Sequence, residues 1–283
     1  MQLTRELILA DPHSFSRRRS PLKWAGGKYQ ILDQICAQLP KGKRLLEPFA
    51  GSGVVSLNVP FDAYVLNDLN QDLISFYRTV QEDLGAYTHR TRPLFCEQNN
   101  CAEQYYRLRE KFNRSRSKRV RASLFLYLNK HGYNGLCRYN SKGEYNVPFG
   151  RYKRVLFPEP ALLNLATHSR KAQYVSEDFE AFMLKARKGD VVYCDPPYAP
   201  LSSTANFTGY SANGFHEQDQ QRLVRTAKIL AKRGIPVLIS NHDTGFVREH
   251  YRQAKLVNFK VRRAISCQGK NRKPAEEILA VFA

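Results

Sequence analysis

The most constraining feature of the sequence is an apolar run, Val191 to Cys194, which stops at Asp195 and is followed by Pro196, Pro197 and Tyr198. The run predicts a strand, and proline has no amide hydrogen for a sheet ladder, so the prolines predict that the strand ends at Asp195. Open α/β sheets bind ligands at the carboxyl ends of their strands, so Asp195 and Tyr198 are expected to share one crevice. The simpler alternative is a strand followed by an ordinary proline turn.

Short apolar runs alternate with helical segments along most of the chain, which predicts an α/β fold with a parallel sheet. Strands are expected at 44–46, 63–66, 173–175, 190–194 and 236–240. Helices are expected after residue 31, from residue 54, from residue 73, near 179–187 and over 217–232. Two last runs, 256–261 and 278–282, have no long helix between them, so we expect an antiparallel hairpin at the sheet edge.

The net charge indicates the partner. The chain carries 45 Lys and Arg against 25 Asp and Glu, a formal net charge of +20. Solubility requires a magnitude of only ~2–8 for a small domain, so a polyanion such as nucleic acid is the expected partner. The alternative is a protein that its charge merely keeps in solution.

Residues 86–160 interrupt the strand–helix alternation and predict an insertion. Helices are expected at about 102–113 and 120–130, a dense basic run covers 113–121, and the Gly-, Asn-, Tyr- and Arg-rich segment 130–152 predicts a long loop or hairpin. Long loops in compact domains are usually functional. The predicted organisation is a mobile basic arm at 1–19, an α/β domain at 20–85 and 161–283, and an inserted domain at 86–160; the resemblance given below implies that the first of these domains is catalytic and that the insertion recognises the DNA target.

Cysteine and histidine usage gives no sign of a metal centre. The six cysteines (Cys36, Cys96, Cys101, Cys137, Cys194 and Cys267) have no CxxC spacing and form no ligand pattern with the seven histidines, so no metal is expected. Free thiols suit a reducing compartment, and the apolar run at 7–10 is too short for a signal or membrane segment. The expected location is the cytoplasm, without a membrane partner.

A second strand end predicts a cofactor site. Gly51 and Gly53 follow the strand at 44–46, and Asp68 ends the next strand at the same edge. In dinucleotide-binding folds such glycines let the backbone approach the cofactor, and the acid holds ribose hydroxyls. The third glycine expected for a pyrophosphate is missing, so a cofactor without phosphates, S-adenosylmethionine, fits better. For Asp68, the alternative is the N-cap of a helix.

The Asp-Pro-Pro-Tyr turn suits transfer to an aromatic amine. The amino group of adenine is a poor nucleophile because its lone pair is delocalised into the ring. Hydrogen bonds to the Asp195 carboxylate and the Pro196 carbonyl would favour a tetrahedral nitrogen with its lone pair free. Tyr198 offers a ring for stacking, worth ~1–3 kcal/mol per base. Methyltransferases that modify a base in a duplex extrude it first, and we adopt that general step.

Other polar segments allow more than one interpretation. Trp24 could pack on the cofactor or on the core, and Lys28 could bind a carboxylate or cap its loop; the spacing excludes a P-loop. In and beside segment 130–152, Arg138 could read a guanine edge, asparagines, Arg151 and Lys153 could contact the DNA backbone, and tyrosines could intercalate between bases. Alternatively, the segment could contain simple turns. His242 and Asp243 are interpreted as loop and cap residues.

Four segments in one order, Lys23 to Lys28, Glu47 to Gly53, Lys130 to Tyr152 and Asp195 to Pro200, resemble the Dam family of bacterial GATC-specific DNA adenine N6-methyltransferases. The resemblance covers about residues 20–283. Many amino-methyltransferases share Asp-Pro-Pro-Tyr, but the Asn-Gly-Leu-Cys-Arg-Tyr-Asn segment at 134–140 is specific to this group.

The resemblance implies a Rossmann-like methyltransferase sheet with an antiparallel edge hairpin and a mostly helical inserted DNA-recognition domain with a long hairpin loop. It implies methyl transfer from S-adenosylmethionine, leaving S-adenosylhomocysteine, to the N6 amine of adenine in double-stranded DNA at GATC. The enzyme would act as a monomer and without a metal. The rival functions are RNA adenine N6-methylation and non-catalytic DNA binding on the same fold.

The resemblance also implies roles for individual residues. The cofactor would be bound by Trp24, Lys28, Asp68 and Asp195, with Glu47, Phe49, Gly51 and Gly53 lining the site and Asp178 and Phe179 near its adenine. The flipped adenine would be held by Asp195, Pro196, Pro197 and Tyr198. On DNA, Lys23 and Arg138 would read guanines, and Leu136 and Pro148 would contact thymines. Tyr133 would insert into the base stack. The phosphates would be bound by Arg109, Asn134, Asn140, Asn146 and Arg151.

Overall fold

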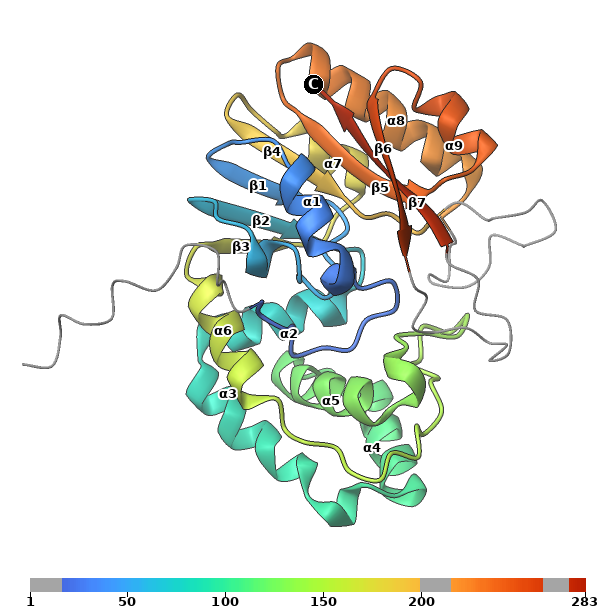
Figure 1. Cartoon of the computed structure of the whole chain (residues 1–283). Coiled ribbons are helices and arrows are strands. Elements are labelled where there is room, and N and C mark those ends of the chain that lie inside the picture. Colours follow the sequence, from blue (N-terminus) through green and yellow to red (C-terminus); the bar gives the residue numbers. More distant parts are fainter. Residues whose placement is uncertain (1–16, 199–214, 262–274) are drawn as a thin grey trace, which may run out of the picture.

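The computed structural model of the chain describes residues 17–198, 215–261 and 275–283 (Figure 1). Within these residues, one seven-stranded sheet has the order β3-β2-β1-β4-β5-β7-β6. The parallel strands are β1 (Arg44–Glu47), β2 (Ala63–Asn67), β3 (Ala172–Val175), β4 (Asp190–Cys194) and β5 (Val237–His242). Strands β6 (Lys255–Val261) and β7 (Ala275–Phe282) are antiparallel and close one edge. The predicted parallel strands and edge hairpin are confirmed.

The chain reverses its direction across the sheet between β1 and β4. From β1 it proceeds outward through β2 to β3, and from β4 it proceeds through β5 to the opposite edge. In open α/β sheets, such a switch point at the carboxyl ends of the strands is where ligands bind. The fold therefore predicts a ligand site beside Asp195, the residue that follows β4.

Helices cover both faces of the sheet and make two apolar cores (Figure 1). The first core contains residues of α1 (Leu32–Gln38), α2 (Gln71–Glu82) and α6 (Glu159–Ser169), and the second contains residues of α7 (Phe179–Leu184), α8 (Glu217–Lys232) and α9 (Gly245–His250). Side chains of β4 alternate between them, with Val191 and Tyr193 in the first and Val192 and Cys194 in the second. An apolar strand buried on both faces is typical of a parallel sheet.

The expected helices of the 86–160 segment are present as α4 (Ala102–Arg114) and α5 (Lys118–His131), preceded by α3 (Leu84–Thr91). Asp72 of α2 connects this segment to the sheet: the guanidinium of Arg121 on α5 binds both its carboxylate oxygens at 2.7 Å, and Tyr139 donates to it at 2.9 Å. The loop and α5 are thereby fixed to α2. The division into domains at residues 86 and 160 stays a prediction.

The helix expected from residue 54 is wrong, because only a short 3-10 turn, η2 (Ser56–Asn58), is present. The Asn58 side chain donates to the carbonyl oxygen of Val54 at 2.7 Å, the acceptor that an α-helical amide at Asn58 would use. Its backbone amide bonds instead to Val55. Pro60 disfavours a helical conformation at the residue before it, so the segment cannot continue as a helix. Helix α7 also ends earlier than expected, at Leu184.

Residues 17–19 of the predicted basic arm contact the short 3-10 turns that precede and follow β1. The Arg18 backbone exchanges two hydrogen bonds with the Asn58 side chain, at 2.7 and 2.9 Å, and the Arg19 guanidinium lies 4.5 Å from the ring centre of Tyr29. Residues 1–16 of the arm lie outside the described residues. In the part of the chain that is described, no helix is long and apolar enough to cross a membrane.

Candidate active site

The carboxylate of Asp195 lies at the sheet's switch point and is held by two side chains. Its Oδ1 atom is 2.8 Å from Nζ of Lys28 and accepts a hydrogen bond of 3.1 Å from Oγ of Ser240, the residue in β5 next to it. Burial raises the pKa of Asp195, and the Lys28 ammonium opposes that rise. The lysine thus favours an ionised carboxylate where burial alone would favour a neutral one.

Lys28 reaches this position from the 3-10 helix η1 (Lys28–Ile31) and is itself only 6 % exposed. Its ammonium also donates to the carbonyl of Gly26 at 2.5 Å and lies 4.6 Å from the ring centre of Tyr198. Both interpretations of Lys28 are therefore correct: its ammonium binds a carboxylate, that of Asp195, and also caps its own loop at Gly26.

Side chains that sequence reasoning missed hold the rest of that turn. Gln220 of α8 donates to the carbonyl of Pro197 at 2.8 Å, and the hydroxyl of Tyr198 donates to Glu277 of β7 at 3.0 Å. The imidazole of His242 packs edge-on against Tyr198, with ring centres 4.7 Å apart. Asp243, interpreted from sequence as a cap, forms an ion pair with Arg248.

The ends of β1 and β2 form the second wall of the candidate site. The amide of Gly51 donates to Asp68 at 3.0 Å, and Asp68 also accepts from the amide of Asn70 at 2.9 Å. Asn70, rather than Asp68, caps α2, so the N-cap interpretation of Asp68 is wrong. Gly51 has a φ of +47°, and a Cβ there would lie 2.7 Å from the indole nitrogen of Trp24. Trp24 therefore lies directly against the glycine turn.

Aromatic rings extend this wall beside α7. Phe49 and Phe179 have ring centres 5.4 Å apart, and Phe215 lies 5.5 and 5.6 Å from them. The carboxylate of Asp178 caps α7 by accepting from the amide of Glu180 and is 2.9 Å from the Arg222 guanidinium. Phe49 and Phe179 thus pack together beside α7, and Asp178 caps that helix; the expected contacts of these three residues with the cofactor stay a prediction.

Glu47, the last residue of β1, is distinguished within the site by its burial, its raised pKa and an unpaired carboxylate oxygen. It is 2 % exposed, burial raises its pKa to about 8, and within the described residues its Oε1 atom has no hydrogen-bond partner. Buried polar atoms are normally paired, so this oxygen marks an unfilled interaction. Gly53, in the turn after β1, is also closely packed, because a Cβ at this position would lie 3.3 Å from the Tyr77 hydroxyl.

The segment 130–152 contains a hairpin with its turn at 140–143. The backbone amide of Asn140 donates to the carbonyl of Glu144, and the amide of Asn146 donates to the carbonyl of Arg138. Tyr139 and Tyr145 form an antiparallel β-bridge between the two sides of the hairpin. Arg138 is exposed and donates to the side chain of Asn146 at 2.8 Å. The predicted hairpin is confirmed, and the simple-turn interpretation is correct for Asn140, whose side chain accepts from two turn amides.

The remaining residues expected at DNA surround the hairpin. Tyr133 and Pro148 are exposed, Leu136 is half-buried against the core, and Asn134 and Arg151 have positive φ angles of 51° and 53°. Arg109 donates to the carbonyl of Val147 at 3.0 Å. The Lys23 ammonium donates to the carbonyl of Lys130 at 2.9 Å and lies 3.6 Å from the Tyr152 ring centre, and burial lowers its pKa to about 8.

A model of the D12 class of N6 adenine-specific DNA methyltransferases matches residues 24–265 of the chain. This chain belongs to that class. As a member of this class it is a DNA adenine methyltransferase, the activity expected from the sequence rather than RNA methylation or non-catalytic DNA binding.

Curated relatives cover nearly the whole of this methyltransferase. A DNA adenine methylase of Escherichia coli K12 is 53 % identical over 94 % of this chain and 96 % of its own length, and one of Serratia marcescens is 51 % identical over 94 % and 99 %. Among solved structures, the C-terminal domain of precorrin-6Y C5,15-methyltransferase from Rhodobacter capsulatus is similar at a TM-score of 0.39 and 10 % identity, over 92 % of this chain and 93 % of that one. The similarity to that structure is too low to support any functional argument.

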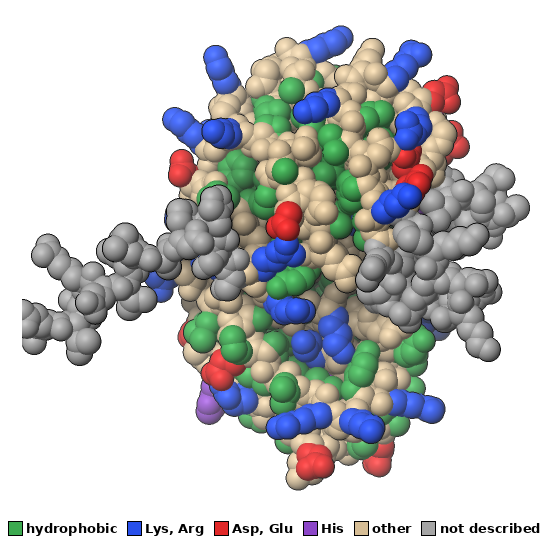
Figure 2. Space-filling view, in the orientation of Figure 1, with side chains coloured by type: hydrophobic (Ala, Val, Ile, Leu, Met, Phe, Trp, Pro, Cys, Tyr) green, Lys and Arg blue, Asp and Glu red, His purple; other side chains and the backbone are tan. Residues whose placement is uncertain are grey.

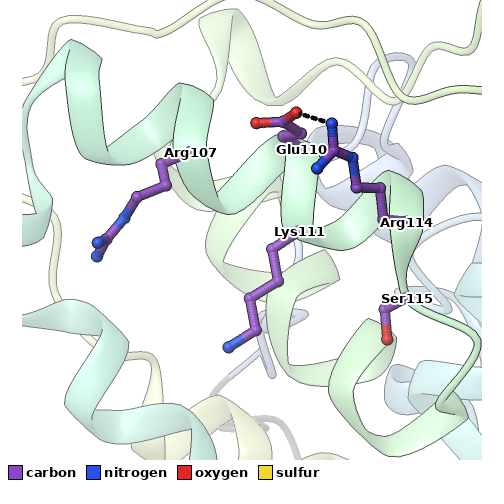
Figure 3. A pocket seen from close by; sticks show the side chains of 5 residues that line it. All are labelled: Arg107, Glu110, Lys111, Arg114 and Ser115. Carbon is purple, nitrogen blue, oxygen red and sulfur yellow. Dashed lines mark ion pairs between the residues drawn. The ribbon is translucent and has the colours of Figure 1, made fainter.

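Basic side chains dominate the charged surface of this methyltransferase on the face shown in Figure 2. On the outer side of α4, a pocket is lined by Arg107, Glu110, Lys111, Arg114 and Ser115 (Figure 3). Glu110 pairs with Arg114, whereas the Arg107 and Lys111 side chains extend into the open (Figure 3). The pocket is cationic and is lined by α4 and the residue that follows it, so it is separate from the site around Asp195.

Proposed function

We propose that the protein transfers the methyl group of S-adenosylmethionine to the N6 amine of an adenine within GATC in double-stranded DNA, after extruding that adenine from the duplex. The observation that carries the proposal is the Asp195–Tyr198 turn, whose carboxylate follows β4 at the switch point of the sheet, next to β1, and is held there by Lys28 and Ser240. The names of the relatives, DNA adenine methylases, agree with this reaction.

The residues at the sheet edge fit a cofactor that carries no phosphate. In dinucleotide-binding folds, a helix begins directly after the glycine turn and its amino terminus binds the pyrophosphate. Here a three-residue 3-10 turn follows instead of a helix. The glycine backbone beside Trp24, the apolar rings of Phe49 and Phe179, and the unpaired oxygen of Glu47 suit a nucleoside with a polar tail. Bound S-adenosylmethionine supplies an electrophilic methyl group.

Residues of the turn prepare the amine for attack. Oδ1 of Asp195 is occupied by Lys28 and Ser240, so Oδ2 is the atom that would accept a hydrogen from the target amine. The Pro197 carbonyl is bonded to Gln220, and we assign the second hydrogen of the amine to the Pro196 carbonyl. Two fixed acceptors would draw the nitrogen toward a tetrahedral geometry and free its lone pair. Most of the rate would then come from positioning.

The hairpin supplies the means of reading the base sequence. Arg138 is exposed, and its contact with Asn146 orients the guanidinium, a group able to bind both acceptors of a guanine edge. Tyr133, 51 % exposed at the base of the hairpin, would occupy the space that the extruded adenine leaves. Lys23 would have to leave its contact with Lys130 to reach a base.

Exposed cations on the outer side of α4 would add a sequence-independent attraction for phosphates. Arg107 and Lys111 lie on this side, and the net charge of +20 has the required sign. Contacts of this kind strengthen binding at every sequence and weaken with salt.

Replacement of Asp195 by Ala tests the assignment of the turn. The variant is expected to bind a GATC duplex with near wild-type affinity and to transfer no labelled methyl group. Because the change leaves Lys28 buried without its partner, Asp195→Asn, which retains the shape, serves as a second variant. Transfer by both variants at near the wild-type rate would exclude Asp195 from the reaction.

A further inference from the structure

The turn after β4 is difficult to anchor, because neither Pro196 nor Pro197 has an amide hydrogen. Two consecutive backbone donors are missing, so the turn must be held through its carbonyls and its neighbours. Ser240 binds its first residue, Asp195, and Glu277 binds its last, Tyr198. Between these two points, the contact to the backbone is made at the carbonyl of Pro197.

Gln220 makes that contact, and its amide can face only one way. Its Nε2 atom donates to Pro197 at 2.8 Å, and its Oε1 atom accepts from Nδ2 of Asn241 at 3.1 Å. A carbonyl oxygen can only accept, so the contact with Asn241 directs the amide nitrogen of Gln220 toward the turn. The side chain is 1 % exposed, which makes both hydrogen bonds obligatory.

Asn241 of β5 extends this network to a third buried side chain, Tyr251. Its Nδ2 atom lies 3.1 Å from the hydroxyl of Tyr251, the residue after α9, and its side chain is fully buried. The preceding residue of the same strand, Ser240, binds Asp195. Two neighbouring residues of β5 therefore support the two halves of the turn, one directly and one through Gln220.

We propose that Gln220 is a positioning residue for methyl transfer. By holding the Pro197 carbonyl toward α8, it sets where the Asp195 carboxylate and the Pro196 carbonyl stand relative to the target amine. The inference rests on the proposed role of the Asp195–Tyr198 turn. It predicts that a change at Gln220 slows the chemical step at saturating DNA and methyl donor without weakening the binding of either.

Gln220→Glu tests the proposal by pH. At high pH the new carboxylate would face the Pro197 carbonyl oxygen without a hydrogen to donate, and the single-turnover rate should fall about 10- to 100-fold. Burial raises the pKa of a glutamate, so lowering the pH restores an O–H donor at this site. The rate of Gln220→Glu relative to wild type should therefore rise as the pH falls from about 8 to about 6, with affinities for DNA and donor unchanged.

Gln221→Glu is the matched control, because Gln221 lies on the same helix and, among the described residues, its side chain donates an exposed hydrogen bond of 3.3 Å to Glu217. It should retain the wild-type rate at every pH. If Gln220→Glu does not fold, Gln220→Met supplies an uncharged side chain of similar length, for which the rate loss should be independent of pH. A rate of the folded variant within twofold of wild type, or a loss of DNA and donor affinity equal to the loss of rate, would overturn the proposal.

Amide hydrogen exchange separates this inference from the proposed function. The peptide covering residues 191–198 should exchange faster in Gln220→Met than in wild type, whether or not methyl transfer is measured. If the wild-type protein transfers no methyl group, the proposed function is wrong, while faster exchange would still identify Gln220 as the anchor of the turn. Unchanged exchange in an active enzyme would refute the positioning role alone.

Discussion

The ammonium of Lys28 lies 2.8 Å from Oδ1 of Asp195 and 4.6 Å from the ring centre of Tyr198, so one buried cation contacts both ends of the reacting turn. Burial raises the pKa of Asp195, and the lysine counteracts this effect. The pair therefore connects the glycine-rich segment that begins at Lys23 to the acceptor that the chemistry requires.

Replacement of Lys28 by Met should shift the pH dependence of methyl transfer. The reaction needs ionised Asp195, so the rate rises as pH increases through the pKa of that carboxyl. Removing the cation raises this pKa further, and the acidic limb of the pH–rate profile should move upward by about 1–3 pH units. Lys28→Arg, which retains the charge, should keep the limb near its wild-type position. If the acidic limb of the pH–rate profile does not move in Lys28→Met, Lys28 does not control the ionisation of Asp195.

Replacement of Arg138 by Ala should relax sequence discrimination at one guanine by ~1–3 kcal/mol. The exposed guanidinium, oriented by Asn146, is suited to a bidentate contact with a base edge. Transfer rates on GATC and on duplexes with that guanine replaced would measure the effect. Discrimination equal to that of wild type would assign the reading of this base to another residue.

Reversal of the Lys111 charge, Lys111→Glu, should weaken DNA binding at all sequences and reduce the slope of log K against log salt by about 1. Lys232→Glu is the control, because Lys232 is exposed at the end of α8, shortly before β5 begins. It therefore lies near the amino ends of the parallel strands, whereas Asp195 lies at their carboxyl ends. Titrations of a labelled duplex at several salt concentrations give both slopes. Equal slopes for the two variants would remove α4 from the DNA contacts.

Acid should destabilise the fold through two buried histidines. Burial lowers the pKa of His131 and of His168 to about 4, against an ordinary value of 6.5. Between these values the unfolded chain binds more protons than the folded protein, so the free energy of unfolding falls as pH drops from about 6.5 to about 4. Each histidine can contribute up to about 3 kcal/mol. Urea unfolding at pH 7 and pH 5 measures this loss, and His131→Gln should reduce it.

The frame of the site could be predicted because it depends on local chemistry. An apolar run followed by two prolines must end at Asp195, and the parallel strands bring Gly51 and Asp68 to the same edge. The helix expected from residue 54 failed for an equally local reason, the Asn58 side chain that occupies the carbonyl of Val54. A single competing hydrogen bond does not alter the apolar pattern from which a helix is predicted.

The anchors of the turn depend on tertiary structure. Ser240 and Glu277 meet the turn only because β5 lies between β4 and β7, an order that the sequence alone did not establish. Gln220 did leave a signal, because it occupies the buried stripe of α8 with Leu223 and Ala227, at positions i, i+3 and i+7. A polar residue on an apolar helix face requires a buried partner, and here that partner is the Pro197 carbonyl.

Methyl transfer to matched duplexes tests the central claim most directly. Purified protein, labelled S-adenosylmethionine and two duplexes that differ only in whether they contain GATC would be incubated under single-turnover conditions. Label in the adenine N6 position of the GATC duplex alone is the predicted result. Equal labelling of both duplexes, or of neither, would contradict it.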